Sequence, residues 1–167
     1  MVKPERDEMT DNENSRPAGQ AAQPVIFIQE LGRDELEQEI ARRTAGRFST
    51  TVLRAALFPE HMEKMDQPDG YAGAQGECGD LMTFYLRIRG ERIQKITFTT
   101  DGCDATIASG EMLASMVTGM ALEQAEQVTP EDLLTALDGL PPNHVHCAAL
   151  AVGTLREAIA SCRGGSA

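Results

Sequence analysis

Residues 81–100 read LMTFYLRIRGERIQKITFTT, and this stretch decides the fold. Apolar residues alternate with polar or charged residues along 82–89, and apolar positions continue through 93–98 after the sequence RGE. A period of two turns every second side chain of a strand toward the same face. Gly90 lies between the two runs, where a tight turn needs it. The sequence therefore predicts an antiparallel β-hairpin with Gly90 in its turn.

C-terminal to the hairpin, the apolar residues recur at the spacing that is typical of helices. The stretch 103–120, CDATIASGEMLASMVTGM, predicts one helix whose methionines fill the core. ALEQAEQV (121–128) and TPEDLLTALDGL (129–140) predict two short helices, the second with Thr129 at its N-cap. After the break at LPP, a last helix is expected from about Asn143 to Ser161.

N-terminal to the hairpin, the signals are weaker. DQPDGYAGAQGECGD (66–80) predicts a glycine-rich loop, and 49–65 predicts a helix with a kink or restart at Pro59. RDELEQEIARR (33–43) predicts a charged, exposed helix. We divide the chain into a disordered tail (1–23), an extension without an assigned role (24–48), a folded domain (49–163) and a short tail (164–167).

The amino-acid composition excludes some classes of function. Hydrophobic residues make up 41% and aromatic residues 4%, without Trp, so the core must be aliphatic and rich in methionine. A net charge of −11 argues against nucleic-acid binding, which needs a basic surface. Because neither a membrane-spanning run nor a secretory signal is visible, we expect a cytoplasmic protein that does not associate with membranes. In that reducing compartment, four cysteines favour metal binding or catalysis over disulfides.

Three of the cysteines lie at junctions between predicted elements. Cys78 lies in GECGD, Cys103 in TTDGCD and Cys147 in PPNHVHC, near the start of the last helix. Glycines beside the first two allow close approach of backbone and metal. Helix N-termini beside Cys103 and Cys147 should lower the pKa of their thiols and favour the metal-binding thiolate.

The spacing of these cysteines excludes two common metal sites. Cys103 follows Cys78 by 25 positions and precedes Cys147 by 44, and the chain has no C-x-x-C pair. Zinc fingers and ferredoxins use close pairs. Ligands from three separate loops indicate a more deformable site, which suits a metal that must arrive and leave. Asp80 or His146 could supply a fourth ligand.

The remaining candidate residues are not expected to take part in this site. Cys162 fits no site, and His61 is expected to be a solvated helix residue. We expect His144 to be exposed.

The motifs together resemble a known family. A Cys-Gly-Asp before the hairpin, the sequence GCDATIAS after it, and LPPNHVHC before the last helix resemble the IscU/NifU-type iron–sulfur cluster assembly scaffolds over residues 51–162. The resemblance implies an α+β fold in which helices cover a small antiparallel three-stranded sheet. The N-terminal extension lies outside the family pattern.

The resemblance also implies a function, which is assembly rather than enzymatic turnover. A cysteine desulfurase would supply sulfur, an iron donor would supply iron, and apo iron–sulfur proteins would receive a [2Fe–2S] cluster. Cys78, Cys103 and Cys147 would be its ligands together with Asp80 or His146, and zinc would bind them in the cluster-free form. Cys147 would accept sulfur, and Asp80 would keep the cluster labile.

The sequence departs from the family pattern at one motif, and two alternative functions remain open. The family's chaperone-recognition sequence LPPVK is LPPNH here, so delivery through an Hsp70-type chaperone is doubtful. A zinc-bound relay that carries persulfide sulfur from a desulfurase is one alternative function. A structural zinc-binding interaction module is the other.

Overall fold

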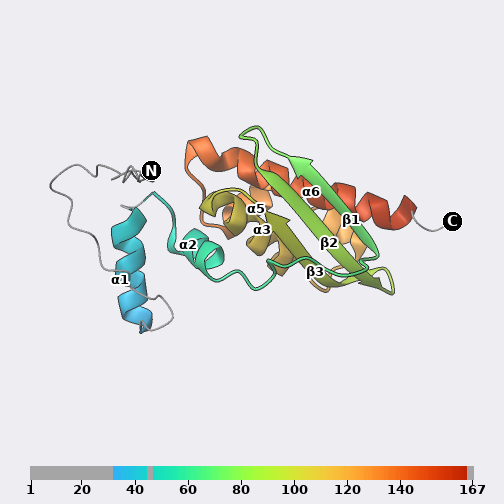
Figure 1. Ribbon diagram of the computed structural model, residues 1–167, viewed down its shortest axis with the longest axis horizontal. Coiled ribbons are helices and arrows are strands. Elements are labelled where there is room, and N and C mark those ends of the chain that lie inside the picture. The colour runs from blue at the N-terminus through green and yellow to red at the C-terminus, as the bar shows by residue number, and fades with distance from the viewer. Residues whose placement is uncertain (1–31, 45–46, 165–167) are drawn as a thin grey trace, which may run out of the picture.

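The structure is a computed structural model that describes residues 32–44 and 47–164 (Figure 1). The predicted tail at 1–23, the residues up to 31 and the last three residues lie outside this part of the chain. A three-stranded antiparallel sheet lies against several helices, which confirms the predicted α+β fold. None of the described helices combines the length and apolar character needed to cross a bilayer.

The sheet is built around the predicted hairpin. Strands β1 (Gly70–Gln75), β2 (Leu81–Arg89) and β3 (Arg92–Thr100) are neighbours in that order. Gly90 and Glu91 form the β2–β3 turn with φ of +57° and +60°, the left-handed conformations that a tight two-residue hairpin requires. On the inner face, the rings of Phe84 and Phe98 pack with centroids 5.9 Å apart.

Strand β1 was not predicted, because its residues read as a glycine-rich loop. Small residues are needed there because helix α6 (Val145–Gly164) packs closely against the strand. A Cβ on Gly70 would lie 2.2 Å from Cys162 Sγ, and the Tyr71 N–H donates to Ser161 Oγ at 2.9 Å. Tertiary packing therefore makes a strand from a segment of low strand propensity.

The helices cover one face of the sheet. Helices α3 (Asp104–Val117), α4 (Leu122–Glu126), α5 (Pro130–Ala136) and α6 follow β3, and α3 and α6 lie behind the sheet in Figure 1. The predicted cap of α5 is confirmed: Thr129 and Asp132 form a reciprocal capping box. The 3₁₀ turn η2 (Pro142–His144) leads directly into α6.

Two helices precede the sheet. The charged helix predicted at 33–43 is confirmed as α1 (Arg33–Thr44), which lies beside α2 and away from the sheet (Figure 1). Helix α2 (Thr50–Leu57) begins at the Ser49 cap and ends before Pro59, and no second helix follows before β1. The chain there runs along β3 and α3.

His61 shows how that segment is held. The Phe98 N–H donates to the His61 carbonyl at 2.9 Å, and His61 Nδ1 lies 2.7 Å from Glu111 Oε1 on α3. The prediction of a solvated helical histidine was therefore wrong, because His61 lies in a bend outside any helix and packs on β3 and α3.

Candidate metal centre

One end of the sheet gathers the predicted ligand residues. Because β2 and β3 are antiparallel, with Met82 opposite Thr100, the chain enters β2 and leaves β3 at the same end. Cys78 lies in the β1–β2 loop, and Cys103 follows β3 as the N-cap residue of α3. The first turn of α6 adds Cys147 at the same end.

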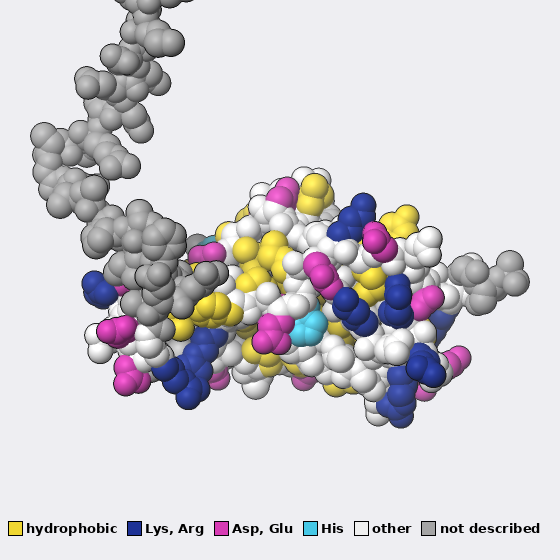
Figure 2. Space-filling model, turned by 60° about the horizontal axis from the view of Figure 1, so that its bottom comes forward, with side chains coloured by type: hydrophobic (Ala, Val, Ile, Leu, Met, Phe, Trp, Pro, Cys, Tyr) yellow, Lys and Arg dark blue, Asp and Glu magenta, His cyan; other side chains and the backbone are white. Residues whose placement is uncertain are grey.

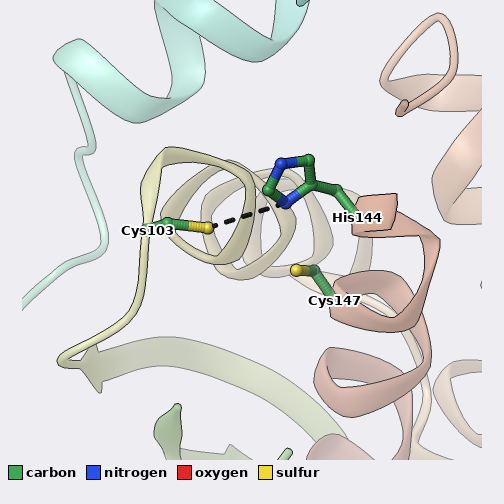
Figure 3. A group of neighbouring side chains, drawn as sticks. All are labelled: Cys103, His144 and Cys147. Atoms are coloured by element: carbon green, nitrogen blue, oxygen red, sulfur yellow. Dashed lines mark hydrogen bonds between the residues drawn. The ribbon is translucent and has the colours of Figure 1, made fainter. Parts of the chain in front are cut away.

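Cys103, Cys147 and His144 face one another (Figure 3). Their ligand atoms all lie within 4.8 Å of one another, and Cys103 Sγ is 3.9 Å from His144 Nδ1. Cys103 caps α3 with extended backbone angles, but its thiol makes no capping hydrogen bond, so the sulfur is available to a metal. We name these three side chains the Cys103–His144–Cys147 cluster.

Cys78 and His146 form a second group beside that cluster. Cys78 Sγ lies 2.9 Å from His146 Nε2, which is itself 3.7 Å from Cys147 Sγ. His146 thus lies between a thiol from the β1–β2 loop and the thiol of α6.

Asp80 is connected to the Cys103–His144–Cys147 cluster through the buried Thr106. The Thr106 hydroxyl donates to Asp80 Oδ2 at 2.7 Å and lies 3.5 Å from Cys147 Sγ and 3.6 Å from Cys103 Sγ. Gly102 permits this approach, since an added Cβ would lie 2.7 Å from Asp80 Oδ2 and from Thr106 Cβ. The carboxylate is therefore held at the edge of the thiol cluster.

The three thiols differ in exposure. Cys78 and Cys103 are exposed, whereas Cys147 is only 1% exposed. Burial raises the pKa of the Cys147 thiol to about 11, and the Thr106 hydroxyl opposes this rise only in part. The expectation that the helix N-terminus lowers this pKa was wrong, because removal of the thiol from water outweighs the dipole of α6.

Charge is unevenly distributed along the sheet. Figure 2 shows one group of Lys and Arg side chains on the right of the visible face and a smaller group toward its left. The β2–β3 hairpin carries four of them toward its turn: Arg87, Arg89, Arg92 and Lys95. The opposite end of the sheet, with the cysteines, carries four carboxylates: Glu77, Asp80, Asp101 and Asp104. These carboxylates favour cations at this end of the sheet, although Arg47 lines the same pocket as His144.

The structure brings together all five residues predicted for the site and adds a sixth. His144 is half-buried, not exposed as expected, and its ring packs on Phe48 with centroids 5.4 Å apart. The spacing of three between His144 and Cys147 could have indicated this, because residues three apart share one helical face. Cys162 lies against Gly70 in β1, outside the site.

Comparisons with known proteins identify a family and several relatives of this chain. A family model described as NifU-like N terminal domain matches residues 48–166. The chain is 41% identical over 114 residues to "Iron-sulfur cluster assembly scaffold protein IscU 1" of Archaeoglobus fulgidus, covering 67% of this chain and 74% of that relative. It is 32% identical over 119 residues to the scaffold protein IscU of Escherichia coli K12, covering 68% and 91%.

A solved structure supports the fold independently. The N-terminal part of a NifU-like protein from Brucella abortus superposes with a TM-score of 0.57 at 18% identity, covering 71% of this chain and 95% of that one.

Proposed function

Because the chain belongs to the NifU-like N-terminal domain family, we propose that it is a scaffold on which an iron–sulfur cluster is assembled and from which the cluster is passed on. One observation carries the proposal: thiols from three separate segments, Cys78, Cys103 and Cys147, gather at one end of the sheet. Thiolates are the usual ligands of iron–sulfur clusters. Two of these thiols are exposed, which suits a cluster that is built and then released.

In this proposal the three cysteines hold a [2Fe–2S] cluster, and Asp80 or His146 supplies the remaining ligand. A carboxylate or imidazole binds iron less strongly than a fourth thiolate would, so the cluster stays transferable. Metal binding must remove the proton of Cys147, whose pKa of about 11 keeps the free thiol neutral at pH 7. Cluster assembly therefore releases protons and weakens as the pH falls.

Sulfur would come from a cysteine desulfurase. A thiolate of the scaffold attacks the outer sulfur of the desulfurase persulfide, and the desulfurase thiolate leaves. The sequence predicts Cys147 as the acceptor, whereas burial favours the exposed Cys78 or Cys103. Mass spectrometry of the persulfidated cysteine, after reaction with the desulfurase in the absence of iron, distinguishes these acceptors.

The partners follow from the same chemistry. The scaffold meets a cysteine desulfurase, an iron donor and apo iron–sulfur proteins, and it acts in the cytoplasm without its own catalytic turnover, nucleic acid or a membrane. A dedicated Hsp70-type chaperone is left out of the proposal. The sequence LPPNH replaces the expected recognition sequence, and His144 within it turns toward Cys103.

Anaerobic reconstitution tests the proposal. Desulfurase, cysteine, ferrous iron and a reductant should give a brown protein with sulfur-to-iron charge-transfer bands and the Mössbauer doublet of a [2Fe–2S] cluster. The double variant C78S/C103S should lose this cluster, because only one of the three thiolates remains. The matched control is Cys162→Ser, which removes a thiol packed on β1 and should leave the cluster intact. A cluster of unchanged yield in C78S/C103S would contradict the proposal.

One alternative is favoured by a specific observation. The compact Cys103–His144–Cys147 cluster has the donor set of a mononuclear zinc site, which suits a zinc-bound sulfur relay. Tight stoichiometric zinc, stimulation of the desulfurase and no cluster after reconstitution would support the relay. A structural zinc module is disfavoured, because Cys78 and Cys103 are exposed and the large buried side chains of the core are not metal ligands. A chelator should therefore strip the metal and leave the domain folded.

A further inference from the structure

Five of the six candidate ligands fall into two groups with different geometry, and Asp80 belongs to neither group. Cys78 Sγ and His146 Nε2 are 2.9 Å apart, which is a hydrogen-bond distance. Cys103 Sγ and His144 Nδ1 are 3.9 Å apart, and Cys147 Sγ completes a set whose members all lie within 4.8 Å. The first group is a hydrogen-bonded pair, and the second is a set of three ligand atoms spaced more widely.

Metal–ligand geometry distinguishes these groups. With zinc–sulfur bonds of about 2.3 Å and zinc–nitrogen bonds of about 2.0 Å, two ligands of one tetrahedral ion lie about 3.5–3.8 Å apart. The Cys103–His144 distance of 3.9 Å is close to that value. The distance of 3.7 Å between His146 Nε2 and Cys147 Sγ is close to it as well, but this nitrogen already pairs with Cys78 Sγ. The Cys78–His146 distance of 2.9 Å is too short, so these two atoms bond to each other and not to a common ion.

The ring of His144 is also held in place. It packs on Phe48, and its backbone N–H donates to the Pro141 carbonyl at 2.8 Å within the 3₁₀ turn. A metal ligand that its surroundings already orient loses little freedom when the ion binds. Lysine is usual at this position in the resembled family sequence LPPVK, and lysine could not serve in the same way while protonated.

We propose that His144 makes the Cys103–His144–Cys147 cluster a binding site for one divalent transition-metal ion, which this cluster holds while Cys78 remains paired with His146. Two thiolates and one imidazole suit Fe²⁺ or Zn²⁺ rather than Mg²⁺ or Ca²⁺, which prefer oxygen. Three protein ligands leave a fourth position open. The Asp80 carboxylate accepts from the Thr106 hydroxyl, which lies 3.6 Å from Cys103 Sγ, so it lies at the edge of this site.

This inference rests on the proposed function for its place in assembly. An ion held by His144 is the first metal to be loaded, and the Cys78–His146 pair opens later to complete the cluster. His144 is thus a loading ligand, and the completed cluster uses the other residues.

Cobalt(II) titration under anaerobic conditions tests the loading site, because Co²⁺ replaces Zn²⁺ and reports thiolate ligation by charge-transfer absorption. His144→Ala should weaken Co²⁺ binding at least about 10-fold. His144→Phe should weaken it equally while retaining a ring against Phe48, so a folding defect is controlled. The matched control is Asn143→Ala in the same turn, on an exposed residue, which should bind Co²⁺ as the unaltered protein does.

The double variant C78S/H146A provides the converse test. It should keep one Co²⁺ ion with the absorption of two thiolates, because the Cys103–His144–Cys147 cluster is intact. Unchanged affinity in both His144 variants, or loss of the ion in C78S/H146A, would overturn the inference.

Reconstitution of the same variants separates this inference from the proposed function. If the unaltered protein assembles a cluster but the His144 variants bind Co²⁺ normally, the loading site is refuted and the scaffold function stands. The opposite outcome is that Co²⁺ binding depends on His144, but neither the unaltered protein nor any variant assembles a cluster. In that case the scaffold function is refuted and the loading site stands.

Discussion

At the scale of single residues, two buried threonines show how differently one hydroxyl can act. Thr106 donates to the Asp80 carboxylate at 2.7 Å and connects it to the thiols. Thr97, in β3, is equally buried, but its Oγ1 has no hydrogen-bond partner among the described residues. Burial of a hydroxyl is unfavourable unless it is hydrogen-bonded. The first threonine should therefore stabilise the domain and the second should not.

Substitution of each threonine by valine tests this contrast. Thr106→Val should lower the free energy of unfolding of the metal-free protein by about 1–2 kcal/mol, because the carboxylate loses its donor. Thr97→Val should leave this free energy unchanged or raise it by up to about 1 kcal/mol. Urea unfolding measures both changes. Equal destabilisation by the two substitutions would show that the Thr106–Asp80 bond does not stabilise the fold.

At the scale of elements, glycines report how closely helices approach their neighbours. Gly110 lies in α3 against β3, where an added Cβ would be 2.7 Å from Cδ2 and Cε2 of Phe98. Gly153 lies in α6 with nothing within 4 Å of such a Cβ. The intrinsic preference of a helix for alanine is the same at both positions, so packing alone separates them.

Alanine at each glycine therefore has opposite expected effects. Gly110→Ala should destabilise by about 1–3 kcal/mol, since the aromatic ring of Phe98 must shift in a filled core. Gly153→Ala should stabilise by up to about 1 kcal/mol, because the helix gains propensity without a clash. Thermal unfolding of the two variants under the same conditions gives the comparison. A stabilising Gly110→Ala would mean that α3 and β3 are less tightly packed than the structure shows.

The helices and strands also differ in how well the sequence predicts them. The hairpin and helices α3, α5 and α6 follow from periodicity and caps that lie within each segment. Strand β1 could not be predicted in this way. Its glycines and alanines are explained only by the close packing of α6 on Gly70 and its neighbours. Likewise, the η2 turn orients His144 and burial raises the pKa of Cys147, and both depend on the assembled fold.

At the scale of the whole molecule, the sheet separates two ends of opposite charge. The β2–β3 turn is basic, whereas the cysteines lie at the other end among four carboxylates. The site lies at one end of the sheet, where two of its thiols are exposed. This position allows a partner to approach the candidate metal ligands without opening the core.

Transfer of the cluster to an acceptor protein is the decisive test of a scaffold. The reconstituted protein is mixed anaerobically with an apo-ferredoxin in the presence of a chelator that captures free iron, and circular dichroism in the visible range follows the cluster. If the protein is a scaffold, its cluster signal should decay as the holo-ferredoxin signal rises, in amounts that match. A cluster that stays on this protein, or iron that appears only on the chelator, would contradict the account.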